Sequence, residues 1–311
     1  MSNPLQRLSK EVVDSLCRLT QQWVRAHPLK PTSREVADGA GRHSATDDGS
    51  ANSIRAASDP LQADGLRTQN QPSDQPALIK YQLSAAERAM KEQRLVEPEI
   101  WESLSSNNAV YRLRSTDGRL NIYKPISGER PGRFGIPNVH GEYAKREVAA
   151  FRVDEILGFG LVPPTAMIEG PRGRGSLQQF VPSIEARAPW HYEELQQQQM
   201  AVLDYIIGNT DRHTGNYRTC LNGRLLATDH GSTFPEKLSD FSSDFIHMYR
   251  NKPFDADVMK SLGAVDPDHL RLALEDIGLS RTATDGALER LYQVRGGSIP
   301  DVQVVTHYIV P

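Results

Sequence analysis

Residues 208–216, GNTDRHTGN, bring an acid, a base, an imidazole and carboxamides into one short polar segment that follows an apolar helical run. Asp211 and Asn216 have the D-x-x-x-x-N spacing of phosphoryl-transfer loops, in which the acid meets an attacking hydroxyl and the carboxamide reaches a magnesium ion. Because Asp and Asn also recur in turns, the motif taken alone favours an ordinary polar turn. The catalytic interpretation therefore depends on other residues of the chain.

A second acidic motif lies a few residues downstream. The apolar run LLA is followed by Asp229-His230-Gly231, which is similar to the D-F-G element whose carboxylate binds magnesium at nucleotide phosphates. An ordinary hairpin exit is the equal alternative. The intervening stretch predicts a hairpin that turns at Asn222-Gly223, and this hairpin would bring Asn216 and Asp229 together as oxygen ligands of one metal.

Two residues upstream of these motifs are further candidates for a phosphoryl-transfer site. Lys124 ends the alternating strand LNIYK, the place from which a lysine grips nucleotide phosphates. Glu147 lies on the next predicted helix, from which a glutamate pairs with that lysine. A solvated strand-edge lysine and a surface glutamate are the alternatives. The order Lys, Glu, Asp with Asn, and then Asp, each on the required kind of element, argues against coincidence.

The elements that must position these residues form two groups. Periodicity and turn signals predict short helices at 84–93 and 98–103, a hairpin at 109–125, a helix at 142–158, and strands at 160–170 and 175–183. Further helices are predicted at 193–209, 239–250, 255–262, 267–277 and 285–293, before a strand-like segment at 301–310. We therefore expect an α+β, bilobal fold, with a small antiparallel sheet and one helix in the N-lobe and a mainly helical C-lobe.

Composition divides the chain into three parts. Residues 1–26 carry apolar side chains at spacings of three and four, which predicts an amphipathic helix that docks either on the core or on a partner. Residues 27–78 hold few large apolar side chains and are expected to form a flexible polar linker. The catalytic domain is expected at 79–311, with an N-lobe at about 79–185 and a C-lobe at about 186–311.

Charge and composition narrow the class of protein. A net charge of -3 over 311 residues lacks the basic balance that a generic nucleic-acid binder needs. The chain has 2 cysteines, too few for a disulfide framework, and no apolar run of about 18 residues that would predict a transmembrane segment. We expect a cytoplasmic protein. A bacterial effector secreted into a host cell is the alternative, which the polar N-terminal region suggests.

The motifs together carry a resemblance. GNTDRHTGN followed by TDHGSTF resembles the D-R-H-x-x-N and D-x-G motifs of the phosphatidylinositol 3- and 4-kinase-like branch of the kinase superfamily. YKPISGERP, REVAAFRVDEILGFGLVPPT and GSLQQFV are similar to a bacterial group of small proteins with that kinase fold. The resemblance covers about residues 105–235, extends only loosely over the rest of the helical lobe, and does not include the first 80 residues.

The resemblance implies a nucleotide site. Lys124 would bind ATP phosphates and Glu147 would hold Lys124 in place. Asn216 and Asp229 would carry Mg²⁺, with Mn²⁺ as a substitute. The usual G-x-G-x-x-G loop is missing before Lys124, and Ser105, Ser106 and Asn107 in SLSSNNAVY would offer hydroxyls and backbone amides to the phosphates instead. The long basic segment 127–142 either folds over the nucleotide, contacts substrate, or is a solvated loop.

The resemblance also implies how the acceptor is handled. Asp211 would orient or deprotonate the acceptor hydroxyl. His213, the third residue of the D-R-H triplet, is a second candidate for the base or a stabiliser of the transition state, and simple packing is its alternative. Arg212 is expected to anchor the loop through hydrogen bonds to backbone carbonyls.

The segment after the D-x-G motif bears on the acceptor. A phosphoinositide headgroup needs cations there, yet residues 232–254 balance three basic side chains against three acidic ones. This favours a Ser or Thr hydroxyl on a protein substrate. A lipid or small-molecule kinase is the first alternative, and a non-catalytic pseudokinase that binds a partner is the second. The pseudokinase alternative is disfavoured because the chain contains all of the polar residues that phosphoryl transfer would use. These are Lys124, Glu147, Asp211, Asn216 and Asp229. The aromatic side chains of the segment are expected to pack in the helical lobe.

Overall fold

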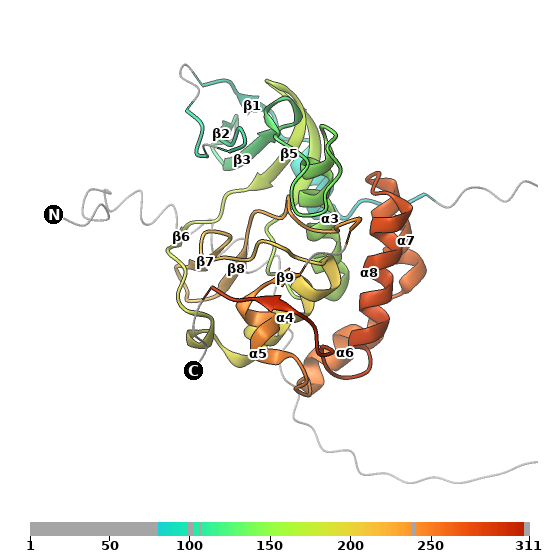
Figure 1. The fold of residues 1–311 in the computed structure, drawn as a ribbon. Coiled ribbons are helices and arrows are strands. Elements are labelled where there is room, and N and C mark those ends of the chain that lie inside the picture. The colour runs from blue at the N-terminus through green and yellow to red at the C-terminus, as the bar shows by residue number, and fades with distance from the viewer. Residues whose placement is uncertain (1–79, 99–101, 106, 238–239, 308–311) are drawn as a thin grey trace, which may run out of the picture. The chain divides into compact units, whose positions relative to one another are not determined.

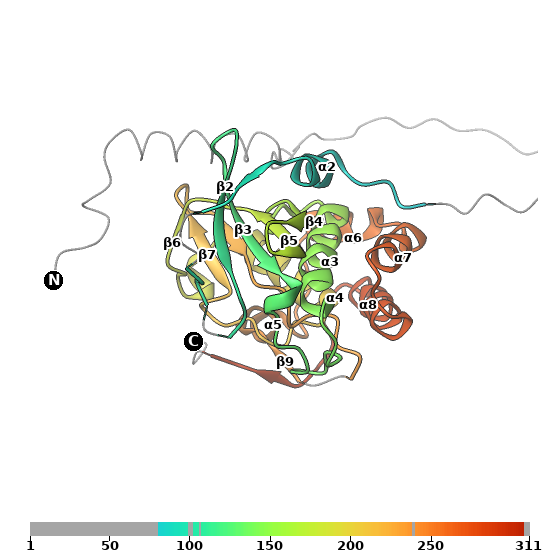
Figure 2. The ribbon, with the colours of Figure 1, turned by 90° about the horizontal axis from the view of Figure 1, so that it is seen from above.

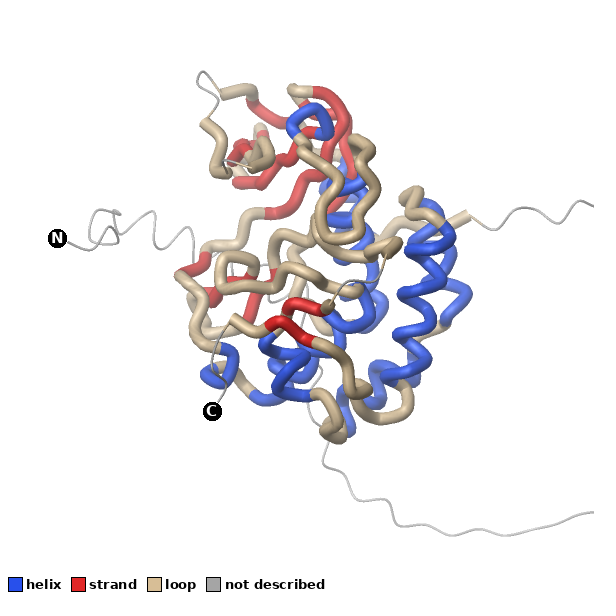
Figure 3. The backbone as a smooth tube through the Cα atoms, viewed as in Figure 1, coloured by secondary structure: helices blue, strands red, loops and turns tan. Residues whose placement is uncertain are grey.

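The computed structural model describes residues 80–98, 102–105, 107–237 and 240–307. The predicted helix at 1–26 and the predicted linker at 27–78 lie outside these residues. Figure 3 shows the largest sheet at one end of the described region and most of the helices at the other. The predicted α+β layout, a small antiparallel sheet followed by a mainly helical lobe, is confirmed.

The larger sheet is antiparallel throughout and has the strand order β1-β2-β3-β5-β4. The predicted hairpin around Asp117-Gly118 is confirmed, because β2 and β3 pair directly across it. The turn between β4 and β5 is shorter than predicted, since β5 already begins at Gly173. The strands are β1 (Leu95–Val96), β2 (Tyr111–Ser115), β3 (Leu120–Pro125), β4 (Thr165–Gly170) and β5 (Gly173–Gln179).

The alternation of β3 directs Lys124 to the side of the sheet that faces a helix. Tyr123 points the other way, into a cluster with Leu113 of β2 and Leu177 of β5. On the opposite face, Met167 of β4 packs against helix α3 (Glu142–Leu157). Figure 2 shows α3 lying along the sheet, so a lysine one residue after Tyr123 is aimed at α3.

The helices of the sheet lobe begin and end at recognisable residues. Helix α2 (Ala85–Lys91) corresponds to the helix predicted at 84–93 and is capped by the Ser84 hydroxyl. The sheet lobe therefore has two helices, α2 and α3, whereas the predicted fold class gave it one. Helix α3 ends at Gly158, whose φ of 71° is the left-handed conformation of a helix stop. The helix predicted at 98–103 is wrong for its described residues, because Pro98, Glu102 and Ser103 are not helical.

The helical lobe has its own core around α4 (Glu194–Ile207), which carries the residues that lead into the GNTDRHTGN segment. Ser or Asp side chains cap the helices that follow. The helix predicted at 239–250 starts only at Asp244, after a short strand. The helices are α5 (Asp244–Tyr249), α6 (Ala256–Ala264), α7 (Pro267–Asp276) and α8 (Arg281–Val294).

Two small sheets complete the lobe. The predicted hairpin at Asn222-Gly223 is confirmed as β7 (Tyr217–Cys220) and β8 (Leu225–Ala227), which β6 (Ser183–Ile184) extends to three strands. Of the segment predicted as a strand at 301–310, the described residues 301–307 contain the short β10 (Val304–Val305), which pairs in parallel with β9 (Phe241–Ser242). Within the described residues, no helix combines the length and apolar character needed to cross a bilayer.

Candidate active site

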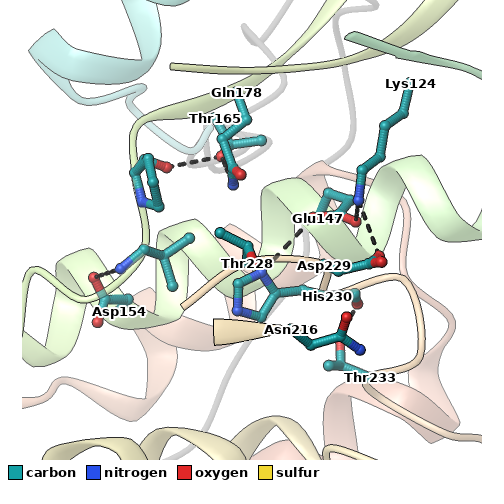
Figure 4. A network of polar contacts seen from close by, with 12 residues as sticks. Lys124, Glu147, Asp154, Thr165, Gln178, Asn216, Thr228, Asp229, His230 and Thr233 are labelled. Atoms are coloured by element: carbon teal, nitrogen blue, oxygen red, sulfur yellow. Dashed lines mark hydrogen bonds and ion pairs between the residues drawn. The ribbon is translucent and has the colours of Figure 1, made fainter. Parts of the chain in front are cut away.

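Lys124 joins the sheet, α3 and the D-x-G motif. Its ammonium group contacts the Glu147 carboxylate and lies 3.0 Å from Oδ1 of Asp229, as Figure 4 shows. Burial alone would lower the pKa of Lys124, but the two adjacent carboxylates outweigh it and raise the pKa above its ordinary value. Lys124 is therefore a permanent cation, and the expected pairing of Lys124 with Glu147 is present.

Glu147 is held between this lysine and a histidine of the D-x-G motif. The ring of His230 is fully buried, and its Nδ1 lies 3.7 Å from Oε2 of Glu147, beyond hydrogen-bond length. Neither ring nitrogen of His230 has a hydrogen-bond partner among the described residues. Burial lowers the pKa of His230, and the Glu147 carboxylate opposes this only in part. The imidazole is therefore neutral near pH 7 and serves as packing behind the glutamate.

We expect this buried imidazole to make stability depend on pH. In the unfolded chain His230 has an ordinary pKa of 6.5 and binds a proton as the pH falls through that value. In the folded protein the pKa of His230 is lower, so the ring stays neutral at the same pH. His230 thus contributes stability above about pH 6.5 that is lost as the pH falls, at up to about 1.4 kcal/mol per pH unit. Urea denaturation of wild type and His230→Phe from pH 7.5 to 5.5 measures this. The wild type should lose more free energy of unfolding than the variant, and parallel profiles would contradict the prediction.

Hydrogen bonds within the GNTDRHTGN segment fix its shape. Helix α4 stops at Gly208, with a φ of 62°, and the Asn209 side chain then accepts the Asp211 N–H at 2.9 Å. The Asn216 side-chain NH₂ donates to the Asp211 carbonyl at 2.6 Å. The nitrogen of the Asn216 amide is therefore occupied, and its oxygen is the atom left to bind a cation.

The same segment determines which ring nitrogen of its histidine accepts a hydrogen bond. Nδ1 of His213 accepts the Gly215 N–H at 2.9 Å, so the neutral ring carries its proton on Nε2. Nε2 lies 3.8 Å from Oδ1 of Asp211. Burial raises the pKa of Asp211, which His213 partly opposes. Asp211 is thus an accessible carboxylate of increased basicity, and His213 is a hydrogen-bond donor beside it.

Arg212 anchors the segment from below, as predicted, through the carbonyls of Asn216 and Thr228. It also forms a fully buried ion pair with Asp204 of α4, with Nη2 at 2.9 Å from Oδ1. The Asp204 carboxylate further accepts from Asn209 at 3.0 Å and from Ser243 at 2.8 Å. Asp204 was missed from sequence, although a lone carboxylate inside the apolar run MAVLDYII was the available signal.

The β7–β8 hairpin aligns the two predicted metal ligands. The N–H of Thr228 donates to the Asn216 carbonyl at 3.0 Å, which places Asp229 next to Asn216 in space. Asp229 has a φ of 55°, the left-handed region that Asp tolerates better than most residues, and its side chain is 57% exposed. Asp229 and Asn216 line the same cleft, and Figure 4 shows the two side chains near each other.

A polar cleft of about 250 Å³ collects the predicted residues. Its lining includes Ser105 and Asn107, whereas Ser106 lies outside the described residues. Reasoning from sequence missed Glu129, Arg130, Arg133 and Phe134 as individual residues, although segment 127–142 was recognised as a candidate cover. The other predicted residues in the lining are Lys124, Glu147, Asp211, His213, Asn216 and Asp229.

The donor set fits a magnesium–nucleotide complex. Mg²⁺ prefers oxygen ligands and is usually held by one or two side chains together with substrate phosphates and water. The cleft offers the Asn216 amide oxygen and the Asp229 carboxylate, with Lys124 beside them as a phosphate partner. Among the described residues, no group of three or more His, Cys, Asp or Glu side chains is placed to hold a metal ion.

The chain is similar in sequence to a family of kinases. The sequence model of the family "Phosphatidylinositol 3- and 4-kinase" matches residues 149–268, which confirms the resemblance predicted from the motifs. Phosphatidylinositol 4-kinase gamma 4 of Oryza sativa subsp. japonica is 30% identical over 205 residues, covering 53% of this chain and 36% of the relative. Protein Rv2133c of Mycobacterium tuberculosis is 28% identical over 231 residues, covering 61% of this chain and 81% of the relative.

Solved structures include similar folds. The crystal structure of the Golgi casein kinase with Mn/ADP bound aligns at a TM-score of 0.44 and 14% identity, covering 67% of this chain and 72% of that chain. The chain spans 36% of the length of the rice relative, so the match concerns a domain of that enzyme.

Proposed function

We propose that this protein is an ATP- and Mg²⁺-dependent phosphotransferase that transfers the γ-phosphoryl group of ATP to an alcohol, with a protein Ser or Thr hydroxyl as acceptor. One observation carries the proposal. The Lys124–Glu147 pair, the Asp211 carboxylate and the two oxygen donors of Asn216 and Asp229 line a single cleft. This is the set that phosphoryl transfer requires, because catalysis there consists mostly of positioning and neutralising phosphate charge.

In this proposal the nucleotide is held by side chains of both lobes. Lys124, whose position is set by Glu147, binds a phosphate oxygen as a point charge. Asn216 and Asp229 hold the metal, which when bound neutralises negative charge on the phosphates. The Asn216 orientation, fixed by its bond to the Asp211 carbonyl, supports this role because the amide oxygen remains available.

The two candidate proton acceptors take different roles in the proposal. Asp211 accepts the proton of the acceptor hydroxyl while the hydroxyl oxygen bonds to the γ-phosphorus and the bond from that phosphorus to the leaving ADP breaks. Asp211 suits this role because burial increases its basicity and its side chain remains reachable. His213 has its Nδ1 lone pair committed to the Gly215 N–H, so it donates from Nε2 to the phosphoryl oxygens. Sequence analysis left open whether Asp211 or His213 is the general base, and these contacts favour Asp211.

A protein acceptor is supported by the residues after the D-x-G motif. Arg250 donates to the Val302 carbonyl at 3.2 Å, and the Lys252 ammonium lies 5.7 Å from the centre of the Tyr249 ring. Arg250 and Lys252 therefore interact with neighbouring groups of the protein, and they are two of the cations that an inositol phosphate headgroup would need in that segment. The names of the plant relatives favour a lipid acceptor as the second candidate.

Incubation with radiolabelled ATP and Mg²⁺ tests the function. Wild type, Asp229→Asn and the control Asp257→Asn are compared on casein, on phosphatidylinositol vesicles and for self-labelling. Asp257 is an exposed residue at the start of α6, outside the cleft. We expect protein labelling by wild type and the control, reduced at least 100-fold in Asp229→Asn. Labelled lipid without labelled protein selects the lipid kinase. No labelling by wild type, or equal labelling by all three, contradicts the kinase assignment.

A further inference from the structure

The cover of the cleft lacks the G-x-G-x-x-G motif of the usual phosphate-binding loop. Two segments form it, which we call the serine strap, residues 103–105 and 107–110, and the arginine loop, residues 128–135. The strap precedes β2, and the loop follows β3, so both leave the sheet at the end that faces the cleft. Ser106, between the two parts of the strap, lies outside the described residues.

Serine hydroxyls give the strap its shape. Oγ of Ser103 accepts the N–H of Ser105 at 3.3 Å and of Val110 at 3.2 Å, which closes the strap on itself. Oγ of Ser105 accepts the Asn107 N–H at 3.2 Å, so the Ser105 hydroxyl proton remains available to a ligand. Side-chain hydrogen bonds thus hold a short turn where a glycine-rich loop would depend on backbone freedom.

The strap and the arginine loop are braced against each other. The N–H of Ala109 donates to the Gly128 carbonyl at 2.9 Å, and the N–H of Arg130 donates to Oδ1 of Asn108 at 2.9 Å. A Cβ added at Gly128 would lie 2.1 Å from Cβ of Ala109, so the two backbones approach as closely as glycine allows. The two segments therefore form one cover.

The arginine loop is also fixed at its other side. The buried Glu129 carboxylate accepts the N–H of Gly141 at 2.6 Å and of Ala144 at 2.7 Å, at the N-terminus of α3. The Gly135 carbonyl accepts the Glu236 N–H at 3.0 Å, which ties the loop to the segment after the D-x-G motif. The loop is thus held in place before any ligand binds.

This fixed loop presents unpaired positive charge to the cleft. Arg130 and Arg133 line the cleft, and no carboxylate of the described residues lies within ion-pair distance of either guanidinium. The same cleft contains Lys124 and the two oxygen donors assigned to the metal. A guanidinium presents a planar fork of donors that matches phosphate oxygens, and two such forks beside the metal ligands suit a polyphosphate.

We propose that Arg130 and Arg133 bind the phosphates of ATP, and that the arginine loop braced on the serine strap replaces the glycine-rich loop. The inference rests on the proposed function for the identity of the nucleotide. Charged side chains on a fixed loop take over the contacts that backbone amides make in a glycine-rich loop. The phosphates would be held by Arg130, Arg133 and the Ser105 hydroxyl from above and by Lys124 from the side.

Isothermal titration calorimetry on the full-length protein tests the inference, with MgATP and adenosine as ligands. The variants are Arg130→Gln, Arg133→Gln and the double variant. Arg112→Gln, exposed on β2 and outside the cleft lining, is the matched control. We expect the Kd of MgATP to rise about tenfold in each single variant and about 100-fold in the double variant. Adenosine affinity should remain within about twofold of wild type, because adenosine has no phosphate.

The outcomes separate this inference from the proposed function. MgATP affinity within about twofold of wild type in the double variant overturns the inference while leaving the kinase assignment intact. An equal loss for MgATP and adenosine also overturns it, because the arginines would then act on the cleft as a whole. Absence of MgATP binding by wild type overturns both. Arg133→Lys, which keeps the charge and loses the fork, should fall between wild type and Arg133→Gln.

Discussion

Replacing Asp211 with Asn is expected to lower kcat for phosphoryl transfer by roughly 10²–10⁴-fold and to leave MgATP affinity within about twofold. The amide keeps the size of the side chain but cannot accept the proton of the acceptor hydroxyl. The Asp211 backbone, which Asn209 and Asn216 hold by hydrogen bonds, is unchanged by the substitution. The loss therefore reports on proton transfer, measured as initial rates at saturating ATP with parallel nucleotide titrations.

His213→Gln is the matched comparison for Asp211→Asn. Glutamine retains an N–H donor, so the expected loss in kcat is smaller than that of Asp211→Asn. In wild type, the rate should fall on the acidic side with a pKa above the ordinary Asp value of 3.8, because burial raises the pKa of Asp211 and the base must be ionised. A larger loss in His213→Gln than in Asp211→Asn would contradict the assignment of the base.

Arg212→Met is expected to cause the largest loss of stability of any single change at the site, about 3–5 kcal/mol in the free energy of unfolding. Both Arg212 and Asp204 are fully buried, and removing the guanidinium leaves an uncompensated carboxylate in the core. The change also removes the donors to the carbonyls of Asn216 and Thr228. Urea denaturation at pH 7 measures the loss, and activity should fall with it.

Arg218→Met provides the control for this second prediction. Arg218 lies on the neighbouring strand β7 and is only partly buried, so its replacement should change the free energy of unfolding by no more than about 0.5 kcal/mol. Asp204→Leu combined with Arg212→Met should recover part of the loss, because no unpaired charge remains. A loss below about 1 kcal/mol in Arg212→Met would show that the buried pair does not support the loop.

The sequence by itself determined the elements that carry the candidate site. The Asp117-Gly118 dipeptide between two alternating runs predicted the hairpin whose second strand ends with Lys124. A glycine stop predicted the end of the helix that carries Glu147. The Asn222-Gly223 hairpin predicted that the two acidic motifs would return to one place. These features depend on periodicity and turn chemistry, which act between residues that are close in the chain.

The prediction of helix at 98–103 failed for a local reason that tertiary structure revealed. The Ser103 hydroxyl closes the serine strap by accepting the N–H groups of Ser105 and Val110. Ser side chains compete with helical hydrogen bonding in this way. Ser103, at the end of the predicted helix, therefore belongs to a turn that packs against the arginine loop.

Only the tertiary structure decided which polar groups are buried together and which face the cleft. The ion pair of Asp204 with Arg212, the packing of His230 behind Glu147 and the placement of Arg130 and Arg133 join segments that sequence analysis treated separately. Periodicity assigns a residue to a face of its own element, but it does not identify the partner across the fold. The charge of each group and the hydrogen-bond donors around it depend on burial and on residues that are far away in the sequence. Both are known only once the chain is folded and packed.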